Sequence, residues 1–257
     1  MKKLFVLIAA ACMTCTAAFA QTVKPFKEGE RAVFLGNSIT DGGHYHSYIW
    51  LYYMTRFPDM PIRVFNGGIG GDTAYDMNKR LDGDIFAMKP SVLMVTFGMN
   101  DSGYFEYNGD KPKEFGEQKY QESIKNYQQM EKRFKDLPDT RIVMVGTSPY
   151  DETVQLKENT PFKTKNETIK RLVEYQQESA AKNNWEFTDL NAPMTAINQQ
   201  YQQKDPTFTL CGSDRIHPDN DGHMVMAYLF LKAQGFVGKE VADMEINANK
   251  KQAVKSE

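Results

Sequence analysis

One short segment near the end of the chain contains the residues of a catalytic base and its partner. Asp214 lies three residues before His217, and Pro218 follows the histidine at once. The proline disfavours helix at His217, so the segment is predicted to be a turn or an extended stretch. A carboxylate this close can orient and polarise an imidazole, which is half of the arrangement that activates a nucleophile. The chemistry therefore depends on which side chain His217 would deprotonate.

Ser38 is the candidate nucleophile. An apolar run at residues 31–36 ends at a glycine and suits a buried strand, and a turn-rich stretch at 37–43 follows it. Small residues allow a sharp turn there, and a serine exposed on such a turn can attack an ester if a base reaches it. Taken alone, Ser38 would be read as a turn residue or a helix cap rather than as a nucleophile. Together with His217 as its base, it predicts nucleophilic acyl transfer.

Acyl transfer also requires hydrogen-bond donors for the oxyanion that develops on the attacked carbonyl group. Gly71 ends the glycine-rich stretch 66–71 and can bring its backbone N–H close to a substrate. The side-chain amide of Asn100 can supply a second donor, and the N–H of Ser38 could be a third. Asp101 is expected to hold its loop rather than to take part in the chemistry.

Strand-like and helix-like stretches alternate along the chain. The expected strands are 31–36, 62–65, 91–97, 141–145 and 186–190, and the expected helices are 48–57, one from about 74, 117–135, 163–183, 192–202 and 220–234. This alternation predicts βαβ units and a mostly parallel sheet with helices on its faces, which is an α/β fold.

Ser38, Gly71 and Asn100 each lie just past an expected strand. Ligands of parallel sheets bind outside the carboxyl ends of the strands, so these three residues should face one crevice. Two long loops, at 101–116 and 147–162, should form its rim. The aromatic side chains of the first loop could stack on a sugar ring, or they could pin the loop to the body of the protein.

Four segments of the chain resemble the sequence blocks of the SGNH, or GDSL-like, hydrolases. The blocks are Gly36-Asn37-Ser38-Ile39, then Asn66 to Gly71 with Asp72-Thr73, then Gly98-Met99-Asn100-Asp101, and finally Asp214-Arg215-Ile216-His217-Pro218. They occur in the family's order and span residues 36 to 218, which makes the resemblance specific. The first block has Asn37 where the family name has aspartate. This departure is mild, because that residue is not itself catalytic in the family.

The resemblance implies a flavodoxin-like, three-layer α/β/α sandwich with a mostly parallel five-stranded sheet. It also implies ester hydrolysis through an acyl-enzyme, with no metal and no other cofactor. By this resemblance Ser38 is the nucleophile, His217 is the base and then the acid, and Asp214 orients the histidine. Gly71 and Asn100 join the Ser38 N–H as the donors of the oxyanion hole.

Five further residues are candidate substrate contacts, namely His44, His46, Asp72, Tyr104 and Phe105. The two histidines follow Ser38 closely and could meet substrate or simply pack within their loop. A metal site would need more ligands than they offer. The glycine-rich block could hold a phosphate group, but it lacks a complete nucleotide-binding fingerprint.

The first twenty residues have the pattern of a secretory signal peptide. Lys2 and Lys3 form a positive end, and residues 4–11 form an apolar centre that is too short to span a bilayer. Ala18-Phe19-Ala20 is a suitable cleavage site. We therefore predict an exported protein that is periplasmic or extracellular. Lipidation of Cys12 is a less favoured alternative.

The composition of the chain bears on its partners, its disulfides and its domain organisation. The net charge of −2, without a basic stripe, argues against nucleic-acid binding. Beyond the signal only Cys211 remains, so no internal disulfide is expected. No later stretch is apolar enough to span a membrane, and the oligomeric state is left open. We expect a hydrolase domain at 21–240 and a polar tail of unknown role at 241–257.

An exported esterase with a polar and aromatic rim suggests O-deacetylation of a carbohydrate. Exported members of the resembled family often act on polysaccharide acetyl esters, so the expected partner is a small-molecule or polysaccharide ester. A lipase, lysophospholipase or arylesterase specificity at the same site is one alternative, and a lipid substrate predicts a large apolar crevice. An alternative from another class is a non-catalytic carbohydrate-binding protein, which would lack a catalytic residue.

Overall fold

The computed structural model describes residues 22–158, 160–238, 244–247 and 252–256, so the expected signal segment lies outside it. The strands of the main sheet are β1 (Arg31–Gly36), β2 (Arg63–Gly68), β3 (Val92–Val95), β4 (Arg141–Gly146) and β5 (Glu186–Asp189). Their order is β2-β1-β3-β4-β5, and every neighbouring pair is parallel. This is the strand order of flavodoxin-like folds, as expected.

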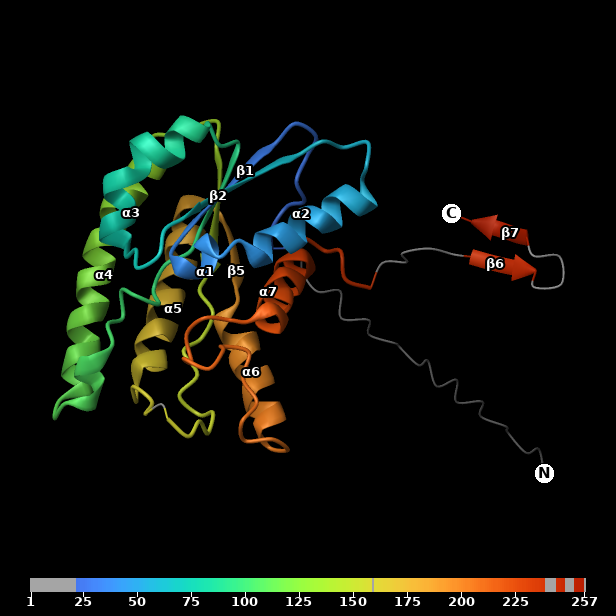
Figure 1. Ribbon diagram of the computed structural model, residues 1–257. Helices are drawn as coiled ribbons and strands as arrows, with labels where there is room; N and C mark the ends of the chain where they lie inside the picture. Colours follow the sequence, from blue (N-terminus) through green and yellow to red (C-terminus); the bar gives the residue numbers. More distant parts are fainter. Residues whose placement is uncertain (1–21, 159, 239–243, 248–251, 257) are drawn as a thin grey trace, which may run out of the picture.

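Helices cover both faces of this sheet (Figure 1). They are α1 (Ser38–Asp41), α2 (His44–Arg56), α3 (Ala74–Arg80), α4 (Pro112–Lys135), α5 (Lys165–Asn183), α6 (Asn191–Gln202) and α7 (Asn220–Ala233), with short π and 3-10 segments at η1 (Leu81–Ile85), η2 (Phe86–Met88) and η3 (Phe105–Asn108). α2, α6 and α7 pack on one face and α3 and α4 on the other, while α5 contributes to both cores. The fold is therefore the expected three-layer α/β/α sandwich. None of the helices in the described ranges is long and apolar enough to cross a membrane.

Strand β1 shows how one apolar run supports both cores. Ala32 and Phe34 belong to the core beneath α2 and α7, whereas Val33 and Leu35 belong to the core beneath α3 and α4. All four side chains are fully buried. Successive side chains of a strand point to opposite faces, so a strand that is covered on both faces must be apolar throughout.

The connections between strands change direction at β1. β2 pairs with one edge of β1, and β3 pairs with the other. In open α/β sheets, ligands bind at this switch point, outside the carboxyl ends of the strands. Ser38 follows β1 and Asn100 follows β3, so the topology places both residues at the switch point.

Several boundaries differ from those expected. α2 begins at His44 rather than near residue 48, and α4 begins at Pro112 rather than near residue 117. Proline suits the first turn of a helix, where its missing N–H is not needed. β2 continues to Gly68, because a glycine there lets the strand pass close to α1; a Cβ at this position would lie 2.2 Å from the backbone nitrogen of Asp41.

The C-terminal tail contains two further strands. They are β6 (Met244–Asn247) and β7 (Gln252–Ser256), and they pair with each other in antiparallel fashion. Figure 1 shows this hairpin apart from the three-layer sandwich. The other residues of the tail lie outside the described part of the chain.

Candidate active site

Ser38 is the first residue of α1, directly after the turn that follows β1. Asn37 caps this helix, because its side-chain oxygen accepts a hydrogen bond from the N–H of Ile39 at 3.0 Å. An asparagine oxygen serves here as an aspartate oxygen would, which accounts for the departure from the family's first block. Gly36 is required at the turn, since a Cβ there would lie 2.1 Å from Oγ1 of Thr40.

His217 lies beside Ser38, although 179 positions separate them in the chain. Nε2 of His217 is 2.7 Å from Oγ of Ser38, and Nδ1 is 2.5 Å from Oδ2 of Asp214. The other carboxylate oxygen of Asp214 accepts hydrogen bonds from the backbone N–H groups of Ile216 and His217, each at 2.9 Å. The three side chains form one hydrogen-bonded line with the geometry of a Ser-His-Asp triad.

The contact between Asp214 and His217 shifts the pKa of both groups. The hydrogen bond with Asp214 raises the pKa of His217, against the effect of burial. Burial alone would raise the pKa of Asp214, but hydrogen bonds from the His217 side chain and from two backbone N–H groups lower it. Asp214 is therefore ionised wherever His217 can act as a base. Both side chains are about half exposed, at 46% and 47%, so the line opens to solvent.

The glycine-rich stretch connects Ser38 to Asn100. A Cβ on Gly70 would lie 3.9 Å from Cβ of Ser38, and Nδ2 of Asn100 donates to the carbonyl oxygen of Asp72 at 3.0 Å. Gly71, between these contacts, is exposed with φ +85°, and no atom would lie within 4 Å of a Cβ there. Among the described residues, the N–H groups of Ser38 and Gly71 have no hydrogen-bond partner. Both groups are therefore available to a ligand.

Residues 34–225 match the sequence model of the GDSL-like Lipase/Acylhydrolase family. The chain belongs to this family. An acetylxylan esterase of Geobacillus stearothermophilus is 27% identical to it over 224 residues, which cover 81% of this chain and 95% of the esterase. The family match and this relative together show that the domain is a carboxylic ester hydrolase.

Solved structures resemble the chain as well. A gut microbial diltiazem-metabolizing enzyme is 85% identical with a TM-score of 0.88, over 92% of this chain and 54% of that one, so this chain spans about half of its length. An acetylxylan esterase from Geobacillus stearothermophilus is 24% identical with a TM-score of 0.65, over 83% of this chain and 96% of that one, which supports the fold. Variants of that esterase in which a serine, an aspartate or a histidine is replaced by alanine are described as catalytic mutants.

In this GDSL-like hydrolase, Asp101 holds the loop that carries Asn100. Its buried carboxylate accepts hydrogen bonds from the N–H groups of Ala74 and Gly98, at 2.9 and 3.0 Å, and from Oγ of Ser123 at 3.0 Å. Burial raises the pKa of Asp101 in spite of these donors. The carboxylate thus joins the end of β3 to α3 and α4, which is the structural role expected from the sequence.

Three of the candidate substrate contacts lie at or near the surface. His44 is exposed, and its ring stacks on that of His223 with centroids 5.0 Å apart. Phe105 is 79% exposed and meets the ring of Phe162 edge-on. Tyr104 is partly buried, and its hydroxyl group contacts Asn100. In the described part of the chain, no group of three His, Cys, Asp or Glu side chains could hold a metal ion.

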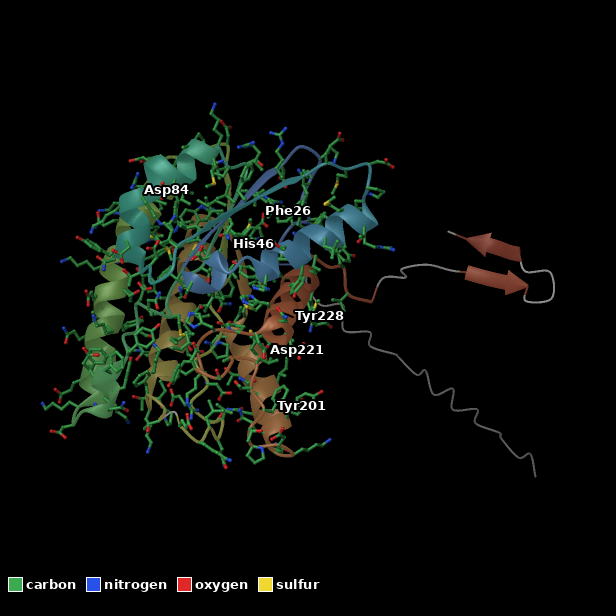
Figure 2. The ribbon with its side chains drawn as sticks, in the orientation of Figure 1. Phe26, His46, Asp84, Tyr201, Asp221 and Tyr228 are labelled. Carbon is green, nitrogen blue, oxygen red and sulfur yellow. The ribbon has the colours of Figure 1, made fainter. Side chains whose placement is uncertain are left out.

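The side chains of the other two candidates are buried, which leaves them little surface that a substrate could contact. His46 is 5% exposed and packs against Phe34, and Figure 2 shows it within the body of the domain. The earlier start of α2 explains this, because His46 shares the buried face of that helix with Ile49. Asp72 is 7% exposed and pairs with Arg80, whose Nε lies 2.6 Å from its carboxylate.

Arg215 lies inside the Asp-His segment and was not among the site residues predicted from the sequence. Its side chain is buried, and the guanidinium donates to the carbonyl oxygens of Asp151 and Val154 at 3.1 and 2.7 Å. Its own carbonyl accepts from the N–H of Asp151 at 3.0 Å. These bonds fasten the segment to the loop after β4. Arginine is usually exposed, so its residue type gave no sign that it is buried. Its position between Asp214 and His217 was the one feature of the sequence that pointed to a role at the site.

Proposed function

We propose that this domain is a serine esterase that removes acetyl groups from a carbohydrate. The observation that supports it best is the line from Oγ of Ser38 through His217 to Asp214, with links of 2.7 and 2.5 Å. The esterase variants described as catalytic mutants replace the same three residue types. Ser38 is the proposed nucleophile, His217 the base, and Asp214 the residue that orients it.

The proposed reaction passes through an acyl-enzyme. His217 takes the proton of Ser38 at Nε2 as Oγ attacks the ester carbonyl carbon, and Asp214 stabilises the resulting imidazolium. His217 then gives this proton to the departing alcohol oxygen as its bond to the carbonyl carbon breaks. Water attacks the acyl-enzyme with His217 again as base, which releases the acid and restores the Ser38 hydroxyl.

The oxyanion of each tetrahedral intermediate needs donors that are already in place. The proposed donors are the free N–H groups of Ser38 and Gly71 and the side-chain amide of Asn100. They belong to the ends of β1 and β3 and to the glycine-rich stretch between them. These segments meet at the switch point of the sheet, so the donors would surround an ester that Ser38 attacks.

Two observations support an acetyl group and a carbohydrate as the parts of the substrate: the identity of the relative and the aromatic surface of the domain. The relative is an acetylxylan esterase, and the exposed ring of Phe105 offers an aromatic surface on the loop that follows Asn100. An apolar groove of about 760 Å³ lies between α2 and α7, with Leu51 and Tyr228 among its lining residues. Figure 2 labels Tyr228 on α7. Neither Ser38 nor His217 lines that groove, so it offers no apolar channel at the nucleophile.

A small drug-like ester is a second candidate substrate. The specific observation in its favour is the 85% identity to a gut microbial diltiazem-metabolizing enzyme across 92% of this chain. Both candidates use the same proposed triad and differ only in what binds at the rim. Diltiazem therefore belongs among the substrates to be tested.

A substrate panel is expected to identify the enzyme as an acetylesterase. We expect faster hydrolysis of p-nitrophenyl acetate than of longer acyl chains, together with acetate release from acetylated xylan or pectin. A short acyl group suits a nucleophile that is open to solvent and lies outside the apolar groove between α2 and α7. Initial rates and an acetate assay measure these outcomes, with the Ser38→Ala protein as control.

Efficient cleavage of long acyl chains without acetate from any glycan would reject the deacetylase proposal and favour a lipase or lysophospholipase. Cleavage confined to aryl esters would favour an arylesterase. Glycan binding without any ester hydrolysis would favour the non-catalytic carbohydrate-binding alternative. Conversion of diltiazem without acetate from glycans would favour the small-molecule substrate.

We also propose that the enzyme is exported and acts in the periplasm or outside the cell. The support is the positive end at Lys2 and Lys3, the apolar centre that follows, and the small residues that end at Ala20. The hydrolase domain would then occupy residues 21–240. Edman sequencing of the protein expressed in a bacterial host should start at Gln21, and a mature chain that still starts at Met1 would contradict the proposal.

A further inference from the structure

A buried lysine lies against the loop that carries Asn100. Lys165 is the first residue of α5, and its side chain is fully buried. Its ammonium group donates to the carbonyl oxygens of Met99 and Gly103, at 2.7 and 2.5 Å, and to Oγ of Ser102, at 2.6 Å. All three of its donors are therefore used. The acceptors lie on both sides of Asn100 in the chain.

Burying this cation carries a cost that an apolar side chain would avoid. Burial lowers the pKa of Lys165 to about 7, although Asp101 and Glu152 oppose the shift. A well-packed apolar residue at such a position is often neutral or stabilising. The stability of the core therefore does not explain why a lysine occupies this buried position. What it provides is a set of directed hydrogen bonds that hold the backbone around Asn100.

Tyr104 connects Lys165 to the side chain of Asn100. Its ring centroid lies 3.9 Å from Nζ of Lys165, an attractive contact between a cation and an aromatic face. Its hydroxyl donates to Oδ1 of Asn100 at 2.5 Å. Burial, with the charges of Asp214 and Asp101 nearby, raises the pKa of Tyr104. The hydroxyl therefore stays protonated at neutral pH and can donate this bond.

The amide of Asn100 is held at both ends. Oδ1 accepts from Tyr104, and Nδ2 donates one of its two N–H groups to the carbonyl oxygen of Asp72 at 3.0 Å. The direction of the second N–H is thereby determined. A flipped amide would present an oxygen where the oxyanion needs a donor. The bond at Oδ1 also polarises the amide and strengthens donation from Nδ2.

We infer that Tyr104 and Lys165 are positioning residues for the oxyanion donor Asn100. Lys165 holds the backbone of the loop, and Tyr104 holds the amide so that its second N–H faces the ester bound at Ser38. Tyr104 therefore acts through Asn100 rather than as the substrate contact expected from the sequence. The inference rests on the proposed function, which makes Asn100 a donor to the transition state.

A double-mutant cycle between Tyr104 and Asn100 tests the inference. Asn100→Ala alone should lower kcat for p-nitrophenyl acetate by ~10²–10³-fold. Tyr104→Phe removes only the hydroxyl group and should lower kcat about tenfold, with KM little changed. In the Asn100→Ala protein, Tyr104→Phe should cause no further loss, because the amide that it positions is absent.

Two variants outside the contacts of Lys165 and Asn100 serve as matched controls. Tyr127→Phe also removes a buried hydroxyl, one that is hydrogen-bonded to Oγ of Ser179 at 2.7 Å without touching Asn100 or the backbone beside it. Asn108→Ala removes an exposed amide. Both should keep the kcat of the unmodified enzyme. Thermal unfolding of every variant separates a lower kcat from a loss of folded protein.

Lys165→Met replaces the ammonium group at similar volume and removes its three hydrogen bonds. It should lower kcat at least about tenfold in the unmodified enzyme and have no effect on kcat in the Asn100→Ala protein. If the Lys165→Met protein does not fold, the double-mutant cycle between Tyr104 and Asn100 still tests the inference.

The outcomes separate the inference from the proposed function. Unchanged kcat in the Tyr104→Phe protein would overturn the inference, and so would an equal loss in both backgrounds. If Asn100→Ala itself kept full kcat, the proposed donor role of Asn100 would fail, and with it the site on which the inference rests.

Discussion

Replacing Ser38 with alanine is expected to lower kcat for p-nitrophenyl acetate by about 10⁴-fold or more, the largest effect of any substitution in the site. The change removes the Oγ atom that lies 2.7 Å from Nε2 of His217, so no acyl-enzyme can form. Residual hydrolysis would come from water and the remaining oxyanion donors. Initial rates measure the loss, and mass spectrometry of the unmodified enzyme, trapped with a slow ester, should place the acyl group on Ser38.

Ser47→Ala is the matched control for this substitution. Ser47 is exposed on α2, and its hydroxyl donates to the carbonyl oxygen of Gly43 rather than to any residue of the triad. This variant should keep the kcat of the unmodified enzyme, and both variants should unfold near its melting temperature. Substantial esterase activity in the Ser38→Ala protein, or an acyl group on another residue, would reject the mechanism.

Changing Asp214 to asparagine should have the second largest effect, a fall in kcat of about 10⁴-fold, as the loss of the aspartate does in other triads. The carboxylate accepts from Nδ1 of His217 at 2.5 Å and so sets the tautomer that leaves Nε2 free to take the serine proton. A side-chain amide can donate to Nδ1 instead, which favours the wrong tautomer. Steady-state kinetics at the pH optimum measure this loss.

The same substitution should move the acid limb of the pH profile. His217 must be neutral to take a proton, so kcat/KM falls as the pH drops through the pKa of His217. Because Asp214 raises that pKa, the unmodified enzyme should lose activity at a higher pH than a free imidazole would dictate. Asp214→Asn removes this influence. The midpoint of the acid limb should therefore shift to lower pH.

Asp221→Asn changes the charge of the protein by the same amount and is the control. Asp221 is exposed in the first turn of α7 and has no contact with the triad. Its replacement should leave both kcat and the acid limb in place. An acid limb that stays or rises in the Asp214→Asn protein, or that moves equally in both variants, would contradict the pairing of Asp214 with His217.

The parts of the site that follow from local rules can be predicted from the amino-acid sequence. Asp214 and His217 are three residues apart, so their pairing requires only a turn, and Pro218 favours one. Ser38 and Asn100 follow apolar runs that read as buried strands. Alternation of strands and helices then implies a parallel sheet, whose strand ends meet at one edge. The order of the elements and the position of the site could therefore be predicted.

Which polar side chains are buried, and what they contact, follows from the packing of the folded chain. Lys165 reads as an ordinary residue at a helix start, yet the loop after β3 closes over its ammonium group. His46 and Asp72 lie close in sequence to the site residues, yet one faces the sheet and the other pairs with Arg80. Burial depends on elements that are distant in sequence and pack against a residue. Neither the type of a residue nor its neighbours in the chain can therefore specify it.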